Sequence, residues 1–192
     1  IRSPLANLQQ SITPTPYQAI QLQRMERAFK ALYDANSIED TLRAGGFVLT
    51  AQNIAPYLQS MVEGYANNGV PIRFFSPSMD IYAVYDDIHF VDVIDHLVNN
   101  ARRYATLGTQ IEISLQITQD VVVEVFNQGR TIDDVESIFE LNVSDSSHPG
   151  SLGVGLFFSR LLMSAMEGRI YAENRPNGVA VLLTLPRATN TL

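Results

Sequence analysis

The sequence has no cysteine, and lysine occurs once, at Lys30, among 13 basic residues. The absence of cysteine excludes disulfide bonds, a thiol nucleophile and a cysteine-ligated zinc site. The three histidines, His89, His96 and His148, are too few and too scattered to predict a metal centre from their spacing. No apolar run approaches the ~20 residues of a membrane span and no signal peptide opens the chain, so we expect this segment not to be membrane-embedded.

The charge balance is acidic, with 20 Asp and Glu against 13 Lys and Arg and a formal net charge of −7. A surface of that sign does not attract the phosphates of DNA or RNA, so we expect no nucleic-acid partner. The 192 residues are 46% hydrophobic and 17% charged, which is typical of a globular chain. That length allows one large domain, or a smaller domain with a helical appendage.

The first 46 residues are predicted to form two helices. Apolar residues recur at helical spacing from Ile1 to Ile12, and a Thr-Pro-Thr-Pro run then ends that helix. A second helix is predicted from about Tyr17 to Gly45-Gly46. Helices joined by so short a turn are antiparallel neighbours, and such a hairpin buries too little surface to be stable alone. We interpret residues 1–46 as a dimerising helical hairpin.

Residues 47–192 show mixed helical and strand periodicities. The segment from Ile111 to Ile117 alternates apolar and polar residues, as in a half-buried strand, and Asn53 is positioned to cap a helix. Helices are predicted at 54–67, 88–105 and 154–166, and strands at 72–75, 81–84, 111–117, 121–126, 169–172 and 179–185. Because strands and helices do not alternate strictly, the predicted fold class is α+β, with this part forming a two-layer sandwich.

The helix predicted at 88–105 carries a polar stripe beside its apolar one. His96, Asn100 and Arg103 recur at steps of four and three, next to the stripe that begins at Phe90. An asparagine oxygen can bind Mg²⁺, and an arginine one turn further can bind phosphate. On spacing alone, a solvated helix edge or one paired with acidic residues is the simpler interpretation.

Two further segments carry candidate ligand-binding residues. Asn127 follows an apolar strand and can hydrogen-bond to a base edge, and Gly129 lets a flat ring approach the backbone. Residues 150–156 place three glycines ahead of a helix, where free backbone N–H groups suit a phosphate. They lack the preceding strand and later acid of a dinucleotide-binding motif. Taken singly, the first segment is more simply interpreted as a strand-to-loop turn. The second is equally well interpreted as a glycine-capped connector.

The segments occur in the order of the conserved boxes of a known family. The segment from Asp95 to Tyr104 resembles the N-box of bacterial sensor histidine kinases, and that from Val125 to Ile132 resembles their D- or G1-box. Ile138-Phe139-Glu140 lies where the F-box is expected, and Gly150 to Leu156 resembles the G2-box. At the front, Ile1 to Leu5 resembles the end of the H-box. The resemblance extends over almost the whole chain.

This resemblance implies a fold and an activity. Residues 1–46 would form the dimerisation and histidine-phosphotransfer hairpin, half of a homodimeric four-helix bundle. Residues 47–192 would form an ATP-binding domain of the Bergerat type, shared with gyrase B, Hsp90 and MutL. The implied function is an ATP- and Mg²⁺-dependent protein-histidine autokinase of a two-component system. It would pass its phosphate to an aspartate of a response-regulator receiver domain, from the cytoplasmic part of a longer, membrane-anchored sensor.

The resemblance also assigns roles to single residues. Asn100 would bind Mg²⁺ as the metal ligand, Arg103 would contact phosphate, and Asn127 would bind the adenine amino group above Gly129. The glycines of the G2-box would let a lid fold over the triphosphate. The ATP-binding residues implied in this way are His96, Asn100, Arg103, Tyr104, Asn127, Gly129, Thr131, Ile132, Gly153, Val154, Gly155 and Leu156.

The chain departs from the family pattern at several positions. The acceptor histidine is expected two positions before Ile1, so no catalytic residue of that kind lies in this chain. His96 stands for the first N-box asparagine, Thr131 for the second G1-box glycine, and Ala180 for a threonine near the adenine. Residues 142–152 contain no Lys or Arg to contact the γ-phosphate.

These departures leave alternatives open. The first is a degenerate, pseudokinase-like module that binds nucleotide and acts by its conformation. The second is an ATP hydrolase of the gyrase or Hsp90 type, but those enzymes use a glutamate where this chain has His96. A serine kinase of the anti-sigma type would lack the H-box signature at Ile1 to Leu5.

Overall fold

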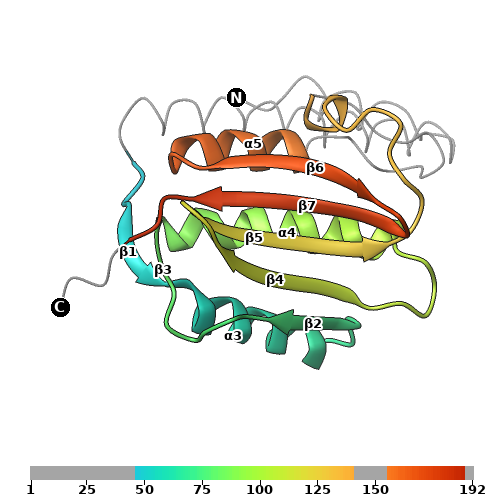
Figure 1. Ribbon diagram of the computed structural model, residues 1–192, viewed down its shortest axis with the longest axis horizontal. Coiled ribbons are helices and arrows are strands. Elements are labelled where there is room, and N and C mark those ends of the chain that lie inside the picture. The colour runs from blue at the N-terminus through green and yellow to red at the C-terminus, as the bar shows by residue number, and fades with distance from the viewer. Residues whose placement is uncertain (1–45, 141–154, 189–192) are drawn as a thin grey trace, which may run out of the picture.

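The computed structural model describes residues 46–140 and 155–188 (Figure 1). The hairpin predicted for residues 1–46 falls outside them except for Gly46, and so do Gly153 and Val154 of the predicted nucleotide loop. These expectations therefore remain predictions.

A five-stranded mixed sheet is the centre of the fold. Its strand order is β2-β4-β5-β7-β6, and only the β2–β4 pair is parallel. The strands are β2 (Ile72–Phe75), β4 (Ile111–Ile117), β5 (Val121–Gln128), β6 (Arg169–Arg175) and β7 (Gly178–Leu185). The period-two alternation of β4 buries Ile111, Ile113 and Leu115, as the sequence predicts.

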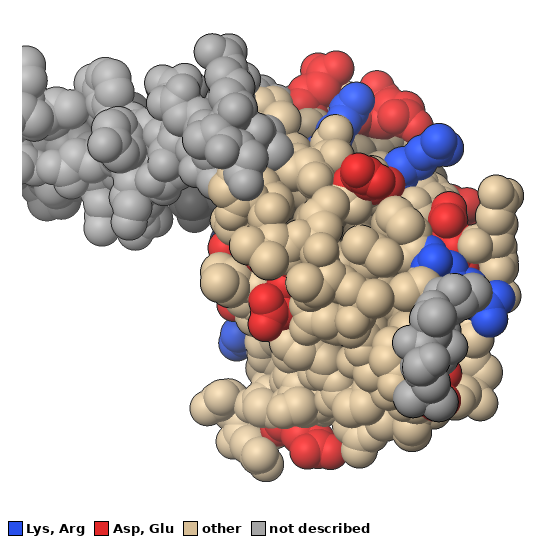
Figure 2. Space-filling view, turned by 90° about the vertical axis from the view of Figure 1, so that its left-hand side faces the viewer, with Lys and Arg blue, Asp and Glu red and all other residues tan. Residues whose placement is uncertain are grey.

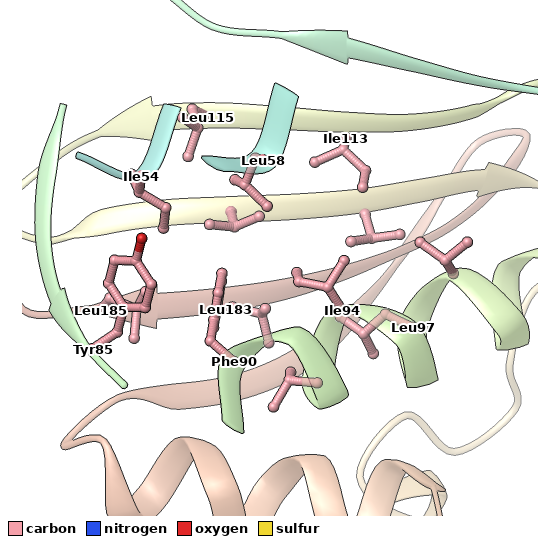
Figure 3. Packing of buried hydrophobic residues seen from close by; sticks show 14 of the residues in the cluster. Ile54, Leu58, Tyr85, Phe90, Ile94, Leu97, Ile113, Leu115, Leu183 and Leu185 are labelled. Atoms are coloured by element: carbon pink, nitrogen blue, oxygen red, sulfur yellow. The ribbon is translucent and has the colours of Figure 1, made fainter. Parts of the chain in front are cut away.

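In the described part of the chain, three α-helices cover one face of this sheet (Figure 1). They are α3 (Ile54–Asn67), α4 (Asp87–Tyr104) and α5 (Gly155–Ala165), and the short 3₁₀ helix η1 spans Ser137–Phe139. Figure 3 shows Leu58 of α3 and Ile94 of α4 packing against Leu183 of β7, within one continuous core. The opposite face carries a smaller cluster around Ala180. The predicted α+β sandwich is confirmed for the described residues.

A small second sheet closes one end of the molecule. Strand β1 (Thr50–Asn53) pairs antiparallel with β3 (Tyr82–Tyr85), and β1 is absent from the predicted elements. Asn53 is the N-cap residue of α3, as predicted, but its side chain makes no capping bond. Its Oδ1 instead accepts from the Ile81 N–H at 3.2 Å and its Nδ2 donates to the Met79 carbonyl at 2.9 Å. The amide therefore joins β1 to the segment before β3.

Charged side chains lie interspersed on the end of the molecule that carries β1 and β3, where most visible atoms belong to uncharged residues (Figure 2). The ion pairs that arginines form among the described residues are partly or largely exposed, as in Arg73–Glu112 at 2.7 Å. Such pairs contribute at most about 1 kcal/mol each. The buried core is therefore the main source of stability.

Helix α4 begins at a buried carboxylate. Asp86 is 3% exposed, and its Oδ1 accepts from the His89 N–H at 3.0 Å and lies 2.8 Å from His89 Nδ1. Its Oδ2 accepts from the Val48 N–H at 2.8 Å, and the Phe47 ring packs on His89 with centroids 4.2 Å apart. Burial alone would raise the pKa of Asp86, but these hydrogen bonds outweigh it and lower the pKa. Asp86 thus links Val48, which precedes β1, to the first turn of α4.

We expect Asp86→Ala to lower the free energy of unfolding by about 2–3 kcal/mol, because it removes a helix cap and leaves the part-buried N–H groups of His89 and Val48 without their acceptor. Asp87→Ala, at an exposed position in the same turn, should cost only about 0.3–1 kcal/mol. Because the folded pKa of Asp86 is lowered, its contribution is present above the ordinary value of 3.8 and is lost as the pH falls through the folded pKa. Urea unfolding at pH 7 and in strong acid measures both effects. Equal losses for the two variants at pH 7 would contradict this role.

Candidate functional site

Helix α4 presents its polar stripe at the edge of the core. The predicted apolar stripe is confirmed, since all of its members are buried: Phe90, Ile94, Leu97, Val98 and Ala101. Beside it, His96 and Asn100 are half-buried and Arg103 is exposed. A half-buried amide keeps its oxygen accessible to a ligand while the helix fixes its position. Of the three polar residues, Asn100 is therefore the best placed for ligand binding.

The end of α4 meets the end of β5. Ala105 forms an antiparallel bridge with Gly129, and the Thr106 N–H donates to the Gln128 carbonyl at 2.8 Å. A Cβ atom on Gly129 would lie 2.4 Å from the Tyr104 carbonyl oxygen. That approach is possible only without a side chain, which explains the glycine at this position.

Asn127 lies inside β5, two residues before Gly129, and not in a loop after the strand. The apolar run ends at Phe126, but pairing with Val179 of β7 continues the strand to Gln128. The Asn127 side chain is buried, with the residue 9% exposed, and its Nδ2 donates to the Gln128 carbonyl at 3.3 Å. Nδ2 also lies 3.2 Å from where a Gly129 Cβ would be. The Asn127 amide and Gly129 therefore lie next to each other at the end of β5.

The start of α5 lies against α4 one turn before Asn100. A Cβ on Gly155 would be 3.6 Å from Cδ2 of His96, and His96 Nδ1 is 3.3 Å from Oγ of Ser159. Burial lowers the pKa of His96, although Asp92 and Asp95 oppose that shift. The ring is therefore predominantly neutral at pH 7.

Helix α4 therefore brings most of the predicted site together. His96 contacts the Gly155 region and the Tyr104 carbonyl faces Gly129, with Asn100 one helical turn from each along α4. Gly153 and Val154 lie outside the described residues, so their predicted roles remain predictions.

Three predicted residues stand apart from this group. Thr131 is exposed, and Leu156 packs against the hydrophobic core. Ile132 is fixed by Asn174 of β6, whose Oδ1 accepts from the Ile132 N–H at 2.9 Å and whose Nδ2 donates to the Ile132 carbonyl at 2.8 Å. Neither Asn174 nor Ser159 is among the predicted residues. Helical spacing could have suggested Ser159, four residues after Gly155, whereas Asn174 carries no sequence signal.

The donor set fits a magnesium nucleotide better than a metal bound by protein alone. Among residues 46–140 and 155–188 there is no group of three or more His, Cys, Asp or Glu that could hold a metal ion. The amide oxygen of Asn100 is a suitable single protein ligand for Mg²⁺, which usually keeps waters and substrate phosphates as its other ligands. In the same part of the chain, no helix is long and apolar enough to cross a membrane.

The chain matches a known family of ATP-binding domains. Residues 85–189, more than half of the chain, match the model of the histidine kinase-, DNA gyrase B- and HSP90-like ATPases. That match begins just before α4 and contains every ATP-binding residue predicted above. The prediction of an ATPase domain of this type is confirmed, and the family implies ATP as its ligand.

Curated relatives are sensor kinases. The chain is 25% identical over 146 residues to the sensor histidine kinase YvrG of Bacillus subtilis, which is 69% of this chain and 24% of that protein. It is 25% identical over 120 residues to WalK of the same organism, which is 57% of this chain and 20% of WalK. The sensor protein BasS of Salmonella typhimurium is 29% identical over 85 residues, 43% of this chain and 24% of BasS. The chain thus spans about a quarter of the length of the relatives it matches.

Solved structures of histidine kinases share the fold. The catalytic domain of ThkA aligns with a TM-score of 0.62 at 24% identity, covering 73% of this chain and 97% of that one. Full-length ShkA, solved in complex with AMPPNP, aligns with a TM-score of 0.65 at 18% identity, covering 98% of this chain and 42% of that one. The family match, which extends over α4, β5 and α5, shows that the chain belongs to the histidine kinase-, DNA gyrase B- and HSP90-like ATPases.

Proposed function

We propose that the chain is the ATP-binding core of a sensor histidine kinase, which phosphorylates a histidine preceding Ile1. The observation that carries the proposal is the junction at α4, where Asn100 lies between the Gly155 contact of His96 and the Gly129 contact of Tyr104. One helix thereby joins the candidate metal ligand, the candidate base-binding strand end and the candidate phosphate loop.

The adenine would be held at the end of β5. Asn127 is buried and fixed in register by β7, so its amide has the fixed orientation that base recognition needs. Gly129 lets the Tyr104 carbonyl come close to the strand end beside this amide, since a Cβ atom there would lie 2.4 Å from that oxygen. An amide offers both a donor and an acceptor, which suits the amino group and ring nitrogen of adenine.

The triphosphate would lie between α4 and the start of α5. Asn100 would contribute an oxygen ligand to Mg²⁺, and Arg103, exposed in the last turn of α4, would reach phosphate. When bound, Mg²⁺ would neutralise part of the phosphate charge during transfer. The chain's own contribution is positioning, because Asn100 and Asn127 stand on elements joined by backbone hydrogen bonds.

The partners follow from the same proposal. Residues 1–46 would form the dimerisation hairpin and residues 47–192 the catalytic domain. The hairpin would present the acceptor imidazole as part of a homodimeric four-helix bundle. The phosphoryl group would pass to an aspartate of a response-regulator receiver domain in the cytoplasm. The kinship with YvrG and WalK supports this assignment.

The second candidate is a degenerate module that binds nucleotide without transferring phosphate. One observation favours it: His96, which stands for the first N-box asparagine, is half-buried and hydrogen-bonded to Ser159. The two candidates separate when the natural protein, including the residues before Ile1, is incubated with γ-labelled ATP and Mg²⁺. An acid-labile label supports the kinase. ATP binding without label supports the degenerate module, and absence of binding contradicts both.

We expect Asn127→Ala to weaken ATP binding by about 10- to 100-fold, because it removes the hydrogen bonds that a buried amide makes to adenine. Discrimination between ATP and GTP should fall as well, since the amide distinguishes the two bases. Asn67→Ala, at an exposed position of α3, should leave both properties unchanged. Calorimetric titration with the two nucleotides measures both effects, and an unchanged affinity in the Asn127 variant would contradict the base-binding role.

A further inference from the structure

A buried serine joins the start of α5 to the polar stripe of α4. Ser159 is 0% exposed, and its Oγ lies 2.9 Å from the Gly155 carbonyl oxygen and 3.3 Å from His96 Nδ1. A Cβ atom on Gly155 would lie 3.6 Å from the His96 ring. One hydroxyl group therefore connects the first turn of α5 to the residue one turn before Asn100.

The hydrogen-bond partners determine where the protons lie. A serine hydroxyl has a single proton, and inside a helix it commonly donates to the carbonyl four residues earlier. The Gly155 carbonyl can only accept, and its bond to Ser159 is the shorter of the two. The hydroxyl oxygen is then left to accept from His96. His96 must therefore carry its proton on Nδ1, so the neutral ring has a lone pair on Nε2.

The surroundings of His96 keep the ring neutral. Burial lowers the pKa of His96 and outweighs the opposing attraction of Asp92 and Asp95 on the same helix. The Asp95 carboxylate also accepts a hydrogen bond from the Tyr65 hydroxyl of α3. Ser159, the partner that α5 supplies, is uncharged. A single tautomer is thus compatible with these neighbours of the ring in the described part of the chain.

We propose that Ser159 is a positioning residue of the nucleotide site: it fixes His96 as the Nδ1–H tautomer and holds the first turn of α5 against α4 beside Asn100. The proposal rests on the proposed function in one respect, namely that the positioned site binds nucleotide. It also gives position 96 an acceptor on Nε2 where the asparagine of the family pattern would offer an amide. Histidine in place of the first N-box asparagine is thus accompanied by Ser159 on α5, which hydrogen-bonds to it.

The tautomer can be measured without any nucleotide. In the chain labelled with ¹⁵N-histidine, the His96 signals are those that disappear in His96→Asn. We expect protonated Nδ1 and unprotonated Nε2 in the wild type, and a change toward the Nε2–H form in Ser159→Ala. Ser164→Ala, at an exposed position of the same helix, should leave the signals unchanged. A wild-type Nε2–H tautomer, or signals that do not respond to Ser159→Ala, would overturn the proposal.

The positioning role is tested by titrating the chain with AMPPNP and Mg²⁺. We expect Ser159→Ala and His96→Phe each to weaken binding by about 5- to 20-fold, with the double variant no weaker than either, because both break the same connection. His96→Asn should bind within about twofold of the wild type, since its amide N–H can replace Nδ1–H. If Ser159→Ala does not fold, the two His96 variants still decide.

The outcomes separate the two proposals. If the wild type does not bind the nucleotide, the proposed function fails, while the NMR measurement still decides on the Ser159–His96 connection. If the wild type binds and Ser159→Ala binds equally well, the proposed function stands and the positioning role is overturned. Equal weakening by His96→Asn and His96→Phe would likewise contradict a role for the Nδ1–H donor.

Discussion

Asn100→Ala is expected to weaken binding of AMPPNP in the presence of Mg²⁺ by about 10- to 100-fold, the cost of a lost interaction with a charged group. Asn100 is half-buried on α4 and lies four residues from each of two positions of that helix, His96 and Tyr104. Without Mg²⁺ the variant and the wild type should differ by less than about threefold, because the lost partner is the metal. Calorimetry with and without the metal gives both affinities.

Asn99→Ala is the matched control for this experiment. Asn99 is the exposed neighbour on the same helix, whereas Asn100 is half-buried. Its removal should leave Mg²⁺-dependent binding unchanged. Equal losses in the two variants, or a loss in Asn100→Ala that persists without Mg²⁺, would contradict a metal-binding role for Asn100.

Gly129→Ala is expected to lower the free energy of unfolding by about 2–3 kcal/mol, the cost of forcing atoms into a filled space. Its Cβ would lie 2.4 Å from the Tyr104 carbonyl oxygen, a backbone atom that cannot move aside without breaking the bridge between Ala105 and Gly129. Because that bridge joins β5 to α4, nucleotide affinity should fall together with stability. Chemical denaturation and calorimetry of the same variant measure the two quantities.

Gly64→Ala is expected to raise the free energy of unfolding, in contrast to Gly129→Ala. Gly64 is in α3, and a Cβ there would have nothing within 4 Å. Alanine in an exposed helical position should raise stability by about 0.5–1 kcal/mol, since glycine loses more conformational freedom on folding. If both glycine variants were destabilised, or if Gly129→Ala were neutral, the close approach of β5 and α4 would not have the importance assigned to it.

Local patterns of the sequence were sufficient for most of the core. Ile111, Ile113 and Leu115 alternate with polar residues and predict β4 with its observed bounds. The steps of three and four from Phe90 to Ala101 likewise predict the buried face of α4. In both cases the signal is contained in the element itself, because burial of one face sets the period.

Features that depend on distant partners were not predictable in this way. Strand β1 is four residues long and its exposure does not alternate, so only its pairing with β3 defines it. The sequence places Asn127 directly after the strand because the apolar run ends at Phe126, but pairing with β7 keeps it inside the strand. The bond between His96 and Ser159 joins residues 63 positions apart, and no local period reveals it.

The candidate site likewise combines residues that the sequence indicates with contacts that depend on distant partners. The resemblance to sensor kinases directed attention to Asn100, Asn127 and Gly129, and the family match supports the domain that contains them. Nothing in that resemblance indicated that Asn174 would hold Ile132 by two hydrogen bonds, because this contact joins a loop to the far strand β6. The supporting residues of a site depend on the fold as a whole.

The measurement that tests the central claim most directly is an NMR titration of the ¹⁵N-labelled chain with AMPPNP and Mg²⁺. The account predicts that the signals of Asn100, Asn127, Gly129 and Gly155 shift together and follow one binding curve, while those of Phe75 and Met79, exposed residues of another region, stay unchanged. Shifts of these four residues with different affinities, or no shift in any of them at saturating nucleotide, would contradict a single nucleotide site built around α4.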